Sequence, residues 1–462
     1  MNKNCLFVHA HERDKAIFFS SVSNYLSTQG YESIHLTFSR LEEAVYTAHN
    51  VKKPYFLPKV LKTFSSELNE NDKRNYDLEK LLYYTFEFNK INHFSYNKQE
   101  MLINAKRYIN FLNKLNSDKK LELIISWNDT FMFDSISKRF AQVNNIPVLI
   151  FEAGIFRPYT ITVDGKGVNY GNSVPQEMAA YKDVQFHMND YQEFLSSIKD
   201  KQHIFQSQTK NVGDTYLKER LVDYVNRNIF KRELKLEVIF EKPTNKIKRV
   251  ISNKRKNNKN NKNNIHTKDS ELPKDYLFVP FQVHDDSQII MNSDSIKSME
   301  QLVEIIIFQL DEYNRKHNKD LHVVFKEHPA DQGRVDYSSL YDKFKNHTHV
   351  NFLTSGNTNE ILQKSNLVVT INSTVGIEAL QNYKPVITLG NSYYGIDGIA
   401  YKCSNYKNLY EVFHKALTQD VDREAINKFL FYLRFSYQIE GDWRKGIFNA
   451  KELQDKINAV LA

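Results

Sequence analysis

The N-terminal pattern of apolar and polar positions is that of a strand, a helix and a second strand. Residues 6–8 are apolar, apolar residues recur at helical spacing over 14–29, and residues 33–38 again suit a strand. Apolar runs that alternate with helical periodicity predict a parallel sheet covered by helices. The first apolar run is not followed by a glycine fingerprint, so a dinucleotide site is not expected there.

The same alternation continues and then starts again in the second half of the chain. A charged and aromatic segment, 60–120, is expected to form inserted helices before the sheet resumes. The further apolar runs are predicted strands at 121–127, 147–151, 276–281, 321–325, 350–353, 367–371 and 385–389. The predicted fold class is therefore α/β and GT-B-like, with two doubly wound Rossmann-like domains facing a central cleft.

A polar, low-complexity stretch separates the two series. Residues 241–272 are expected to be a basic linker or loop between an N-terminal domain, 1–240, and a C-terminal domain, 273–425. The remaining residues, 426–462, have a helical pattern and are predicted to be C-terminal helices that pack back on the N-terminal domain.

The net charge of +8 is local rather than general. Residues 246–268 hold nine Lys or Arg and no acid, so the rest of the chain is close to neutral. This stretch is either a solvated loop or a site of attraction to an anionic membrane surface or polymer. Nucleic acid is not an expected partner, because aromatic residues are not interleaved with the charges.

Other bulk features bear on the compartment. An apolar run of the roughly 18 residues needed for a membrane helix is not found, and the first apolar run is too short for a signal peptide. Cys5 and Cys403 lie far apart and match no metal spacing. The sequence therefore predicts a protein of a reducing, cytoplasmic compartment.

Three polar clusters follow predicted strands of the second half, at 282–288, 326–333 and 372–376. Parallel strands end at one edge of a sheet, where ligands bind. In the third cluster, Asn372, Ser373 and Thr374 precede a helix whose first turn Gly376 leaves uncrowded. Such a helix start suits phosphate oxygens, and Glu378 could accept hydrogen bonds from ribose hydroxyls. The alternative is a plain N-cap, which is very common.

The second cluster strengthens the case for an anion site. His328 could donate to a phosphate or, when protonated, to a leaving group, and Pro329 fixes the turn after the strand. The Asp-x-Asp at 420–422 opens the C-terminal helices and does not follow a strand. A metal-bridged diphosphate is therefore not expected, and the site is predicted to be metal-independent, with no cofactor.

Taken together, these segments resemble a known family. They are FVPFQVHDDSQI (278–289), KEHPADQG (326–333), NSTVGIEAL (372–380), FEAGIFRP (151–158) and TVDGKGVNYGNSVP (162–175). In this order they resemble the capsular polysaccharide synthesis family, the KpsS/KpsC-type Kdo transferases of Gram-negative bacteria, and more closely its KpsS-like branch. The His-Pro and Ser/Thr elements are also similar to those of CMP-sialic acid transferases.

The resemblance implies a capsule glycosyltransferase with an acceptor-side N-terminal domain and a nucleotide-sugar-binding C-terminal domain. The donor would be CMP-Kdo, and the acceptor phosphatidylglycerol or a Kdo-lipid at the inner face of the cytoplasmic membrane. Other capsule synthesis and export proteins would be its partners. The residues implied to hold the nucleotide are Gln282, His284, Ser287, His328, Pro329, Asn372, Ser373, Thr374, Gly376 and Glu378.

The family's β-linked donor and product imply retention, and double displacement then needs a carboxylate that attacks the anomeric carbon. In the KpsC-like branch the matching motif is Glu-Asp-Gly, but this chain has Ala153 at the Asp position. Glu152 is therefore the predicted catalytic carboxylate, with Asp164 in reserve, and Arg157 could pair with the Kdo carboxylate. The alternative is that Glu152 is a buried acid paired with Arg157.

Two other functions remain open. A transferase of another nucleotide sugar to a capsule glycan would fit the departure at Ala153. A non-catalytic subunit for capsule assembly would fit the fold, although the joint presence of Glu152, His328 and Ser373 argues against it.

Overall fold

The computed structural model describes residues 3–8, 13–196, 217–236, 238–239 and 272–462. The chain forms two compact units, each described here by itself. Unit 1 comprises Met1–Ser173, His187–Phe240 and Leu433–Ala462, and unit 2 comprises Val174–Phe186 and Glu241–Tyr432. Residues 241–271 of the expected linker lie outside the described residues.

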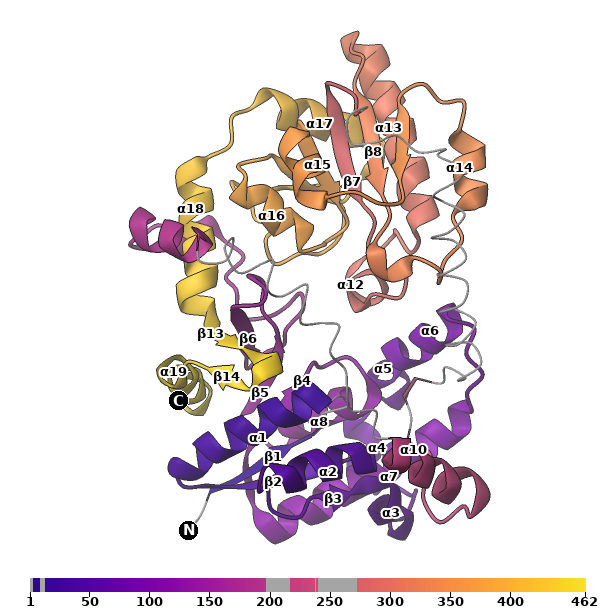
Figure 1. The fold of residues 1–462 in the computed structure, drawn as a ribbon, viewed down its shortest axis with the longest axis vertical. Coiled ribbons are helices and arrows are strands. Elements are labelled where there is room, and N and C mark those ends of the chain that lie inside the picture. The colour runs from indigo at the N-terminus through magenta and orange to yellow at the C-terminus, as the bar shows by residue number, and fades with distance from the viewer. Residues whose placement is uncertain (1–2, 9–12, 197–216, 237, 240–271) are drawn as a thin grey trace. The chain divides into compact units, whose positions relative to one another are not determined.

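Unit 1 is built on an eight-stranded sheet with the order β14-β13-β6-β5-β4-β1-β2-β3 (Figure 1). The strands are β1 (Lys3–Phe7), β2 (Tyr31–Thr37), β3 (Tyr55–Phe56), β4 (Leu121–Trp127), β5 (Val148–Ala153), β6 (Thr160–Asp164), β13 (Gln438–Asp442) and β14 (Ile447–Phe448). The five strands β5, β4, β1, β2 and β3 are parallel to one another, whereas β6, β13 and β14 each pair antiparallel with their neighbours.

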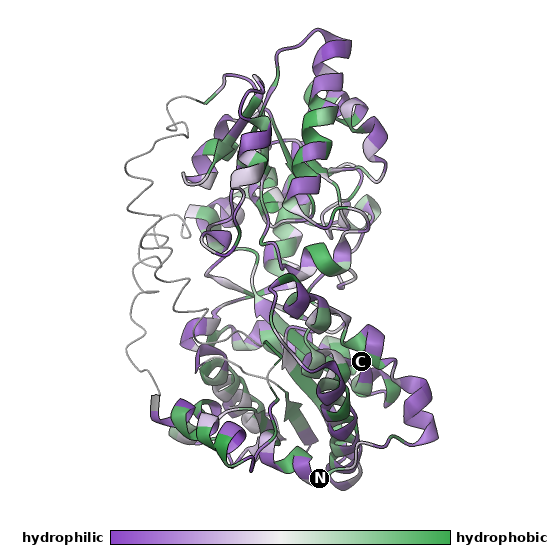
Figure 2. Ribbon diagram, turned by 90° about the vertical axis from the view of Figure 1, so that its right-hand side faces the viewer, coloured by the Kyte–Doolittle hydropathy of each residue, from purple (hydrophilic) through white to green (hydrophobic). Residues whose placement is uncertain are grey.

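Apolar side chains fill both faces of the central strands of this sheet. Along β4, Ile124 packs into one core cluster and Leu123 and Ile125 into the other. This two-sided burial explains why central parallel strands are nearly continuous apolar runs in the sequence. Figure 2 shows the hydrophobic residues concentrated along strands inside the molecule.

Unit 2 has a six-stranded parallel sheet with the order β12-β11-β10-β7-β8-β9. The strands are β7 (Tyr276–Pro280), β8 (His322–Lys326), β9 (Val350–Leu353), β10 (Leu367–Thr370), β11 (Val386–Thr388) and β12 (Tyr401–Lys402). Numbered within the unit, this is the Rossmann order 3-2-1-4-5-6, with the reversal between β7 and β10. The predicted fold class, α/β with two Rossmann-like units, is confirmed.

Helices connect these strands in both units. Those of unit 1 are α1 (Arg13–Thr28), α2 (Arg40–Ala48), α3 (Leu57–Val60), α4 (Glu70–Asn75), α5 (Leu78–Leu81), α6 (Tyr83–Ile91), α7 (Lys98–Lys119), α8 (Met132–Val143), α10 (Leu217–Tyr224) and α19 (Ala450–Leu461). Those of unit 2 are α12 (Ser287–Asn292), α13 (Met299–His317), α14 (Ser338–Phe344), α15 (Thr358–Lys364), α16 (Val375–Gln381), α17 (Leu409–Thr418) and α18 (Arg423–Tyr432). Among the described helices, none combines the length and apolar character needed to cross a bilayer.

The C-terminal stretch differs from the expected run of helices. After α18 the chain forms β13 and β14 before α19, and β13 pairs antiparallel with β6. Ile439 lies opposite Ile161 in this pairing, and both side chains are fully buried. A five-residue strand stabilised by a partner far away in sequence has little periodicity of its own, so the helical interpretation was wrong for β13 and β14. It was right for α18 and α19, and Leu433–Ala462 belongs to unit 1 as expected. The units also divide at Leu433 rather than at 426, and Val174–Phe186 belongs to unit 2 rather than to the N-terminal domain.

Glu42, on α2, is a buried acid that makes unit 1 sensitive to pH. Its carboxylate accepts hydrogen bonds from the Phe38 backbone N–H (2.6 Å) and the Ser39 hydroxyl (3.1 Å). Burial nevertheless raises its pKa from 4.5 to about 8, against the lowering effect of those hydrogen bonds and of the Arg227 charge. The folded state therefore binds a proton that the unfolded state releases, so this group's contribution to stability falls as the pH rises between these values.

We expect the Glu42→Gln variant to lose this pH dependence. Between pH 6 and pH 8 the wild type should lose about 2 kcal/mol of unfolding free energy that the variant retains, since one pKa unit corresponds to about 1.4 kcal/mol. Urea unfolding followed by tryptophan fluorescence measures this, because Trp127 and Trp443, the chain's two tryptophans, both lie in unit 1. Glu70→Gln on the exposed surface is the matched control. Parallel pH profiles for wild type and Glu42→Gln would contradict the prediction.

Candidate active site

The predicted donor residues of unit 2 follow three adjacent strands at one edge of the sheet. Gln282 follows β7, His328 follows β8, and Asn372 follows β10. In doubly wound sheets the crevice between the strands where the order reverses is the usual ligand site. Here that place lies between β7 and β10. The topology thus puts the predicted residues where this fold binds ligands.

Gln282 and Asn372 form the buried centre of this edge. The Gln282 amide donates to Asn372 Oδ1 (2.9 Å), and its carbonyl oxygen accepts from the Asn372 backbone N–H (3.0 Å). The Asn372 amide in turn donates to the Gln288 carbonyl (2.9 Å), and also to those of Asn292 and Asn391 (both 3.3 Å). The exposed fractions of Gln282 and Asn372 are only 3% and 6%. These two side chains therefore hold the loops in place, and the more exposed neighbours are left to contact a ligand.

The start of α16 presents the residues that a ligand can reach. Thr374 is exposed and Ser373 is half-buried, with its hydroxyl accepting from the Val375 backbone N–H (3.2 Å). The Tyr394 hydroxyl donates to the Ser373 carbonyl, and a methyl group at Gly376 would lie 2.6 Å from the Tyr394 ring. Gly376 is thus required because Tyr394 packs against the helix. Glu378 is exposed on the same seven-residue helix.

A histidine and an aspartate join the loops after β7 and β8. Asp331, which is 1% exposed, accepts from the His284 backbone N–H (3.0 Å) and bonds His284 Nδ1 (2.8 Å). The Asp331 carboxylate thereby fixes the orientation of the His284 ring, in which Nδ1 is the nitrogen that donates to Asp331. His328 is half-buried. Its Nδ1 accepts a hydrogen bond from the backbone N–H of Ala330, two residues later in the chain (3.1 Å). Pro329 is exposed beside it.

Sequence reasoning missed several residues of this network. Asp331 lies within the KEHPADQG segment, and its spacing of three residues from His328 was the only available signal. Arg334 forms an ion pair with the buried Asp285, which no local pattern indicates. Ser287, predicted from the FVPFQVHDDSQI segment, begins α12 and is half-buried.

In unit 1 the predicted catalytic Glu152 lies near the carboxyl end of β5. Its Oε2 accepts from the Asn128 amide (2.9 Å), and its Oε1 accepts from the Ala153 backbone N–H (2.9 Å). Asn128 follows the neighbouring strand β4 in a left-handed conformation (φ 71°), and its side-chain oxygen Oδ1 accepts from the backbone N–H groups of Asp129 (2.6 Å) and Thr130 (3.0 Å). Glu152 is half-buried and held in one orientation. This residue was predicted, whereas its positioning partner Asn128 was missed.

Asp164 and Arg157 have different surroundings from those expected. Asp164 is 2% exposed, and it accepts from the backbone N–H groups of Lys166 (2.6 Å) and Ser173 (2.8 Å) and from the Ser173 hydroxyl (2.7 Å). A carboxylate so occupied orders the loop after β6 rather than attacking a sugar. Arg157 is exposed, and its Nε donates to the Gly154 carbonyl (3.1 Å), so the alternative pairing with Glu152 is not seen.

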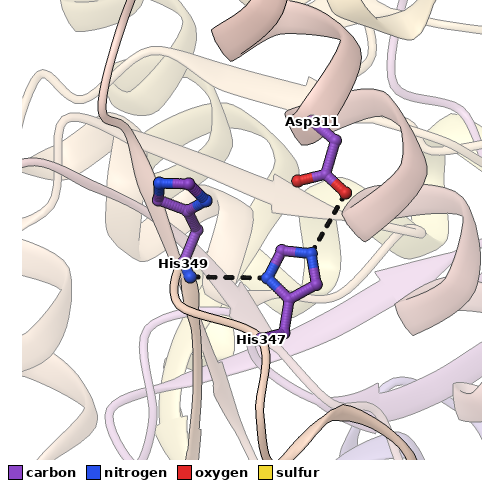
Figure 3. Close-up of side chains that lie close together, drawn as sticks. All are labelled: Asp311, His347 and His349. Atoms are coloured by element: carbon purple, nitrogen blue, oxygen red, sulfur yellow. Dashed lines mark hydrogen bonds and ion pairs between the residues drawn. The ribbon is translucent and has the colours of Figure 1, made fainter.

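One group of potential metal ligands lies away from these residues (Figure 3). Asp311 on α13 is 3.0 Å from His347 Nε2, and His349 Nε2 is 2.8 Å from Asp320. One ligand atom each from Asp311, His347 and His349 lies within 4.8 Å of the others, a set that suits a divalent transition metal such as zinc. His347 and His349 directly precede β9, at the amino ends of the parallel strands, whereas the predicted donor residues follow the carboxyl ends of β7, β8 and β10. A metal held there would not reach a nucleotide at the carboxyl ends.

Two Rossmann-like units, the second with polar residues at its strand-order reversal, define the class of two-domain, doubly wound α/β proteins. The model of the family described as capsule polysaccharide biosynthesis protein matches residues 122–443. The chain belongs to this family, and it is therefore a protein of capsule polysaccharide biosynthesis or modification.

Individual relatives agree with that assignment. The capsule polysaccharide export protein KpsS of Escherichia coli is 25% identical over 64% of this chain and 74% of its own length. The capsule polysaccharide modification protein LipB of Neisseria meningitidis is 24% identical over 75% of this chain and 80% of its own length. Among solved structures, the KpsC β-Kdo 2,7 transferase of Thermosulfurimonas dismutans aligns with 75% of this chain and 88% of its own, with 16% identity and a TM-score of 0.38.

Proposed function

We propose that the chain is a retaining glycosyltransferase of capsule biosynthesis that transfers Kdo from CMP-Kdo to phosphatidylglycerol or a Kdo-lipid. It acts in the cytoplasm at the inner face of the cytoplasmic membrane, next to other capsule synthesis and export proteins, and needs no metal or cofactor. The observation that carries the proposal is the meeting of the loops after β7, β8 and β10 at the strand-order reversal of unit 2. Membership of the capsule family supports the choice of reaction.

The two units supply different parts of the reaction. In unit 2, Ser373, Thr374 and His328 bind the phosphate of the cytidine monophosphate, while Gln282, Asn372 and the surrounding loops keep these donors in place. Because His328 Nδ1 accepts from Ala330 N–H, the neutral ring carries its proton on Nε2 and can donate it to phosphate.

In unit 1, the Glu152 carboxylate attacks the anomeric carbon of Kdo while the bond to the CMP oxygen breaks and CMP leaves. The acceptor hydroxyl oxygen then attacks the same carbon and displaces the Glu152 carboxylate while its proton passes to water, and this second inversion restores the β configuration. Arg157, which is exposed three residues after Gly154, pairs with the sugar's carboxylate in this proposal. Asn128 holds the attacking carboxylate in its orientation.

The direct test is to incubate the protein with CMP-Kdo and phosphatidylglycerol vesicles. We expect release of CMP together with a Kdo-lipid whose β linkage is seen by NMR.

A second expectation concerns the donor site: His328→Ala should weaken CMP binding in calorimetry about tenfold, because one charge-assisted hydrogen bond is lost. His414→Ala, an exposed histidine on α17, is the matched control. Absence of CMP release, or unchanged CMP affinity in His328→Ala, would count against the proposal.

A further inference from the structure

Exposed apolar side chains gather on one segment of unit 1. Of the fourteen large apolar side chains that are exposed among the described residues, six lie within residues 221–239. They are Leu221 (63%), Val222 (36%), Tyr224 (58%), Ile229 (61%), Phe230 (55%) and Ile239 (42%). Single exposed apolar residues are normal in a water-soluble fold, but a group of them marks an interaction surface.

The helix that begins this segment has its polar face inside. On α10, which packs against α2 (Figure 1), Asp223 is 7% exposed and accepts from the Arg40 backbone N–H (3.1 Å) and from its guanidinium. One turn later the Arg227 guanidinium donates to the Phe38 carbonyl. The apolar side chains therefore point outward, which is the reverse of an ordinary surface helix.

The segment is attached firmly to unit 1 despite its exposed apolar residues. The Lys231 carbonyl accepts from Lys62 Nζ (2.9 Å), and the Leu234 N–H donates to the Pro58 carbonyl (2.8 Å). Leu236 and Val238 belong to the buried core of unit 1. The outward-facing apolar side chains therefore belong to a segment that is fixed to unit 1 by hydrogen bonds and by buried residues.

Basic side chains accompany the apolar ones on the outside. The exposed basic residues of α10 and of the rest of the segment up to residue 239 are Lys218, Arg220, Lys231, Arg232 and Lys235. Among the acids of the segment that the structure describes, Asp223 and Glu233 are buried and paired with Arg40, and Glu219 is half-buried. The Arg232 guanidinium also lies 4.8 Å from the centre of the Phe230 ring. Apolar groups flanked by long cationic side chains are the composition of elements that lie in a membrane interface.

We propose that this outward surface, called here the docking surface and made of the six apolar and five basic side chains just named, binds the anionic headgroup region of a lipid bilayer. The apolar groups enter the headgroup–acyl boundary, and the ammonium and guanidinium groups contact lipid phosphates. A second copy of the chain is not the occupant, because two such surfaces would bring like charges together. The sequence after it has the same sign of charge, with nine Lys or Arg and no acid over 246–268.

This inference deepens the proposed function by naming the surface with which the enzyme would approach its lipid acceptor. The two are tested separately, because the binding experiment contains no sugar donor. If vesicle binding fails while CMP-Kdo is still turned over with detergent-dispersed lipid, the docking surface is wrong and the proposed function stands.

The experiment is flotation of the full chain with vesicles of phosphatidylcholine alone or mixed with phosphatidylglycerol. We expect binding to the mixed vesicles that is at least about tenfold stronger than to phosphatidylcholine and that weakens with salt. The triple variant Leu221→Ser, Ile229→Ser, Phe230→Ser should lower binding at least about tenfold, because each side chain loses its apolar contact. Replacing Lys231, Arg232 and Lys235 with glutamate should remove the preference for phosphatidylglycerol.

The matched control replaces three exposed apolar residues elsewhere, Met291, Phe308 and Ile447, with serine. Its vesicle binding should equal that of the wild type. Tryptophan fluorescence on urea unfolding shows whether each variant keeps unit 1 folded. Equal binding of the wild type to both vesicle types, no binding to either, or unchanged binding by the folded triple variant would overturn the docking surface. A folded wild type that ignores vesicles but binds an acidic protein would show that the partner is a protein.

Discussion

The Glu152→Gln variant is expected to transfer Kdo roughly 10³-fold more slowly than the wild type, or not at all. Glutamine has nearly the same shape, so one side-chain oxygen can still accept from the Asn128 amide or the Ala153 N–H. It lacks the negative charge that must attack the anomeric carbon. Affinity for CMP should stay within about twofold, because the residues proposed to bind the nucleotide lie in the other unit. The result would separate loss of chemistry from loss of donor binding.

The measurement is CMP release at saturating CMP-Kdo, with CMP affinity obtained by calorimetry on the same samples. Glu122→Gln is the matched control, since Glu122 is exposed near the other end of the adjacent strand β4. It should leave both the rate and the tryptophan unfolding midpoint unchanged. Near-normal turnover by Glu152→Gln would remove this carboxylate from the mechanism. Asp164 is a poor substitute, because its burial and four backbone or hydroxyl donors tie it to the loop after β6.

The central strands could be predicted because their own residues carry the signal. In the middle of β4 (Leu123–Ile125) and in most of β10, apolar side chains face covered surfaces on both sides, so the sequence shows consecutive apolar residues. The short strands β6 and β13 have no such run. They exist because Ile161 and Ile439 meet across a pairing between segments far apart in the chain. A local pattern does not contain that information.

The candidate site shows the same division between local and distant information. His328 and Ser373 were identifiable because each follows a strand within a recognisable segment. Gln282, His284 and Asn372 were named from their segments as well, but the bonds among the site residues were not foreseen, because Gln282 and Asn372 bond across 90 positions of sequence, and Asp331, which was missed, bonds His284 across 47. Chemistry-bearing residues at strand ends are thus predictable, whereas the hydrogen-bond network that orients them requires the folded chain.

Asn372 is the residue of that network whose loss should destabilise unit 2 most. Replacing it with alanine removes an acceptor for the Gln282 amide and the donor to the carbonyls of Gln288, Asn292 and Asn391. Since the site is buried, these partners are left without water to replace the lost hydrogen bonds. We expect unit 2 to lose about 2–4 kcal/mol of stability, and CMP affinity to fall with it.

The location of this loss can be measured because the two units have different probes. Both tryptophans belong to unit 1, so their fluorescence should report an unchanged unfolding of that unit in Asn372→Ala. Amide hydrogen exchange by mass spectrometry should instead become faster in β7 and β10. Asn359→Ala, on the exposed face of α15, is the matched control and should change exchange in neither strand. If exchange in Asn372→Ala matched that control, the link between Gln282 and Asn372 would not hold these loops together, and Ser373 would owe its position to its bonds with Thr370 and Tyr394.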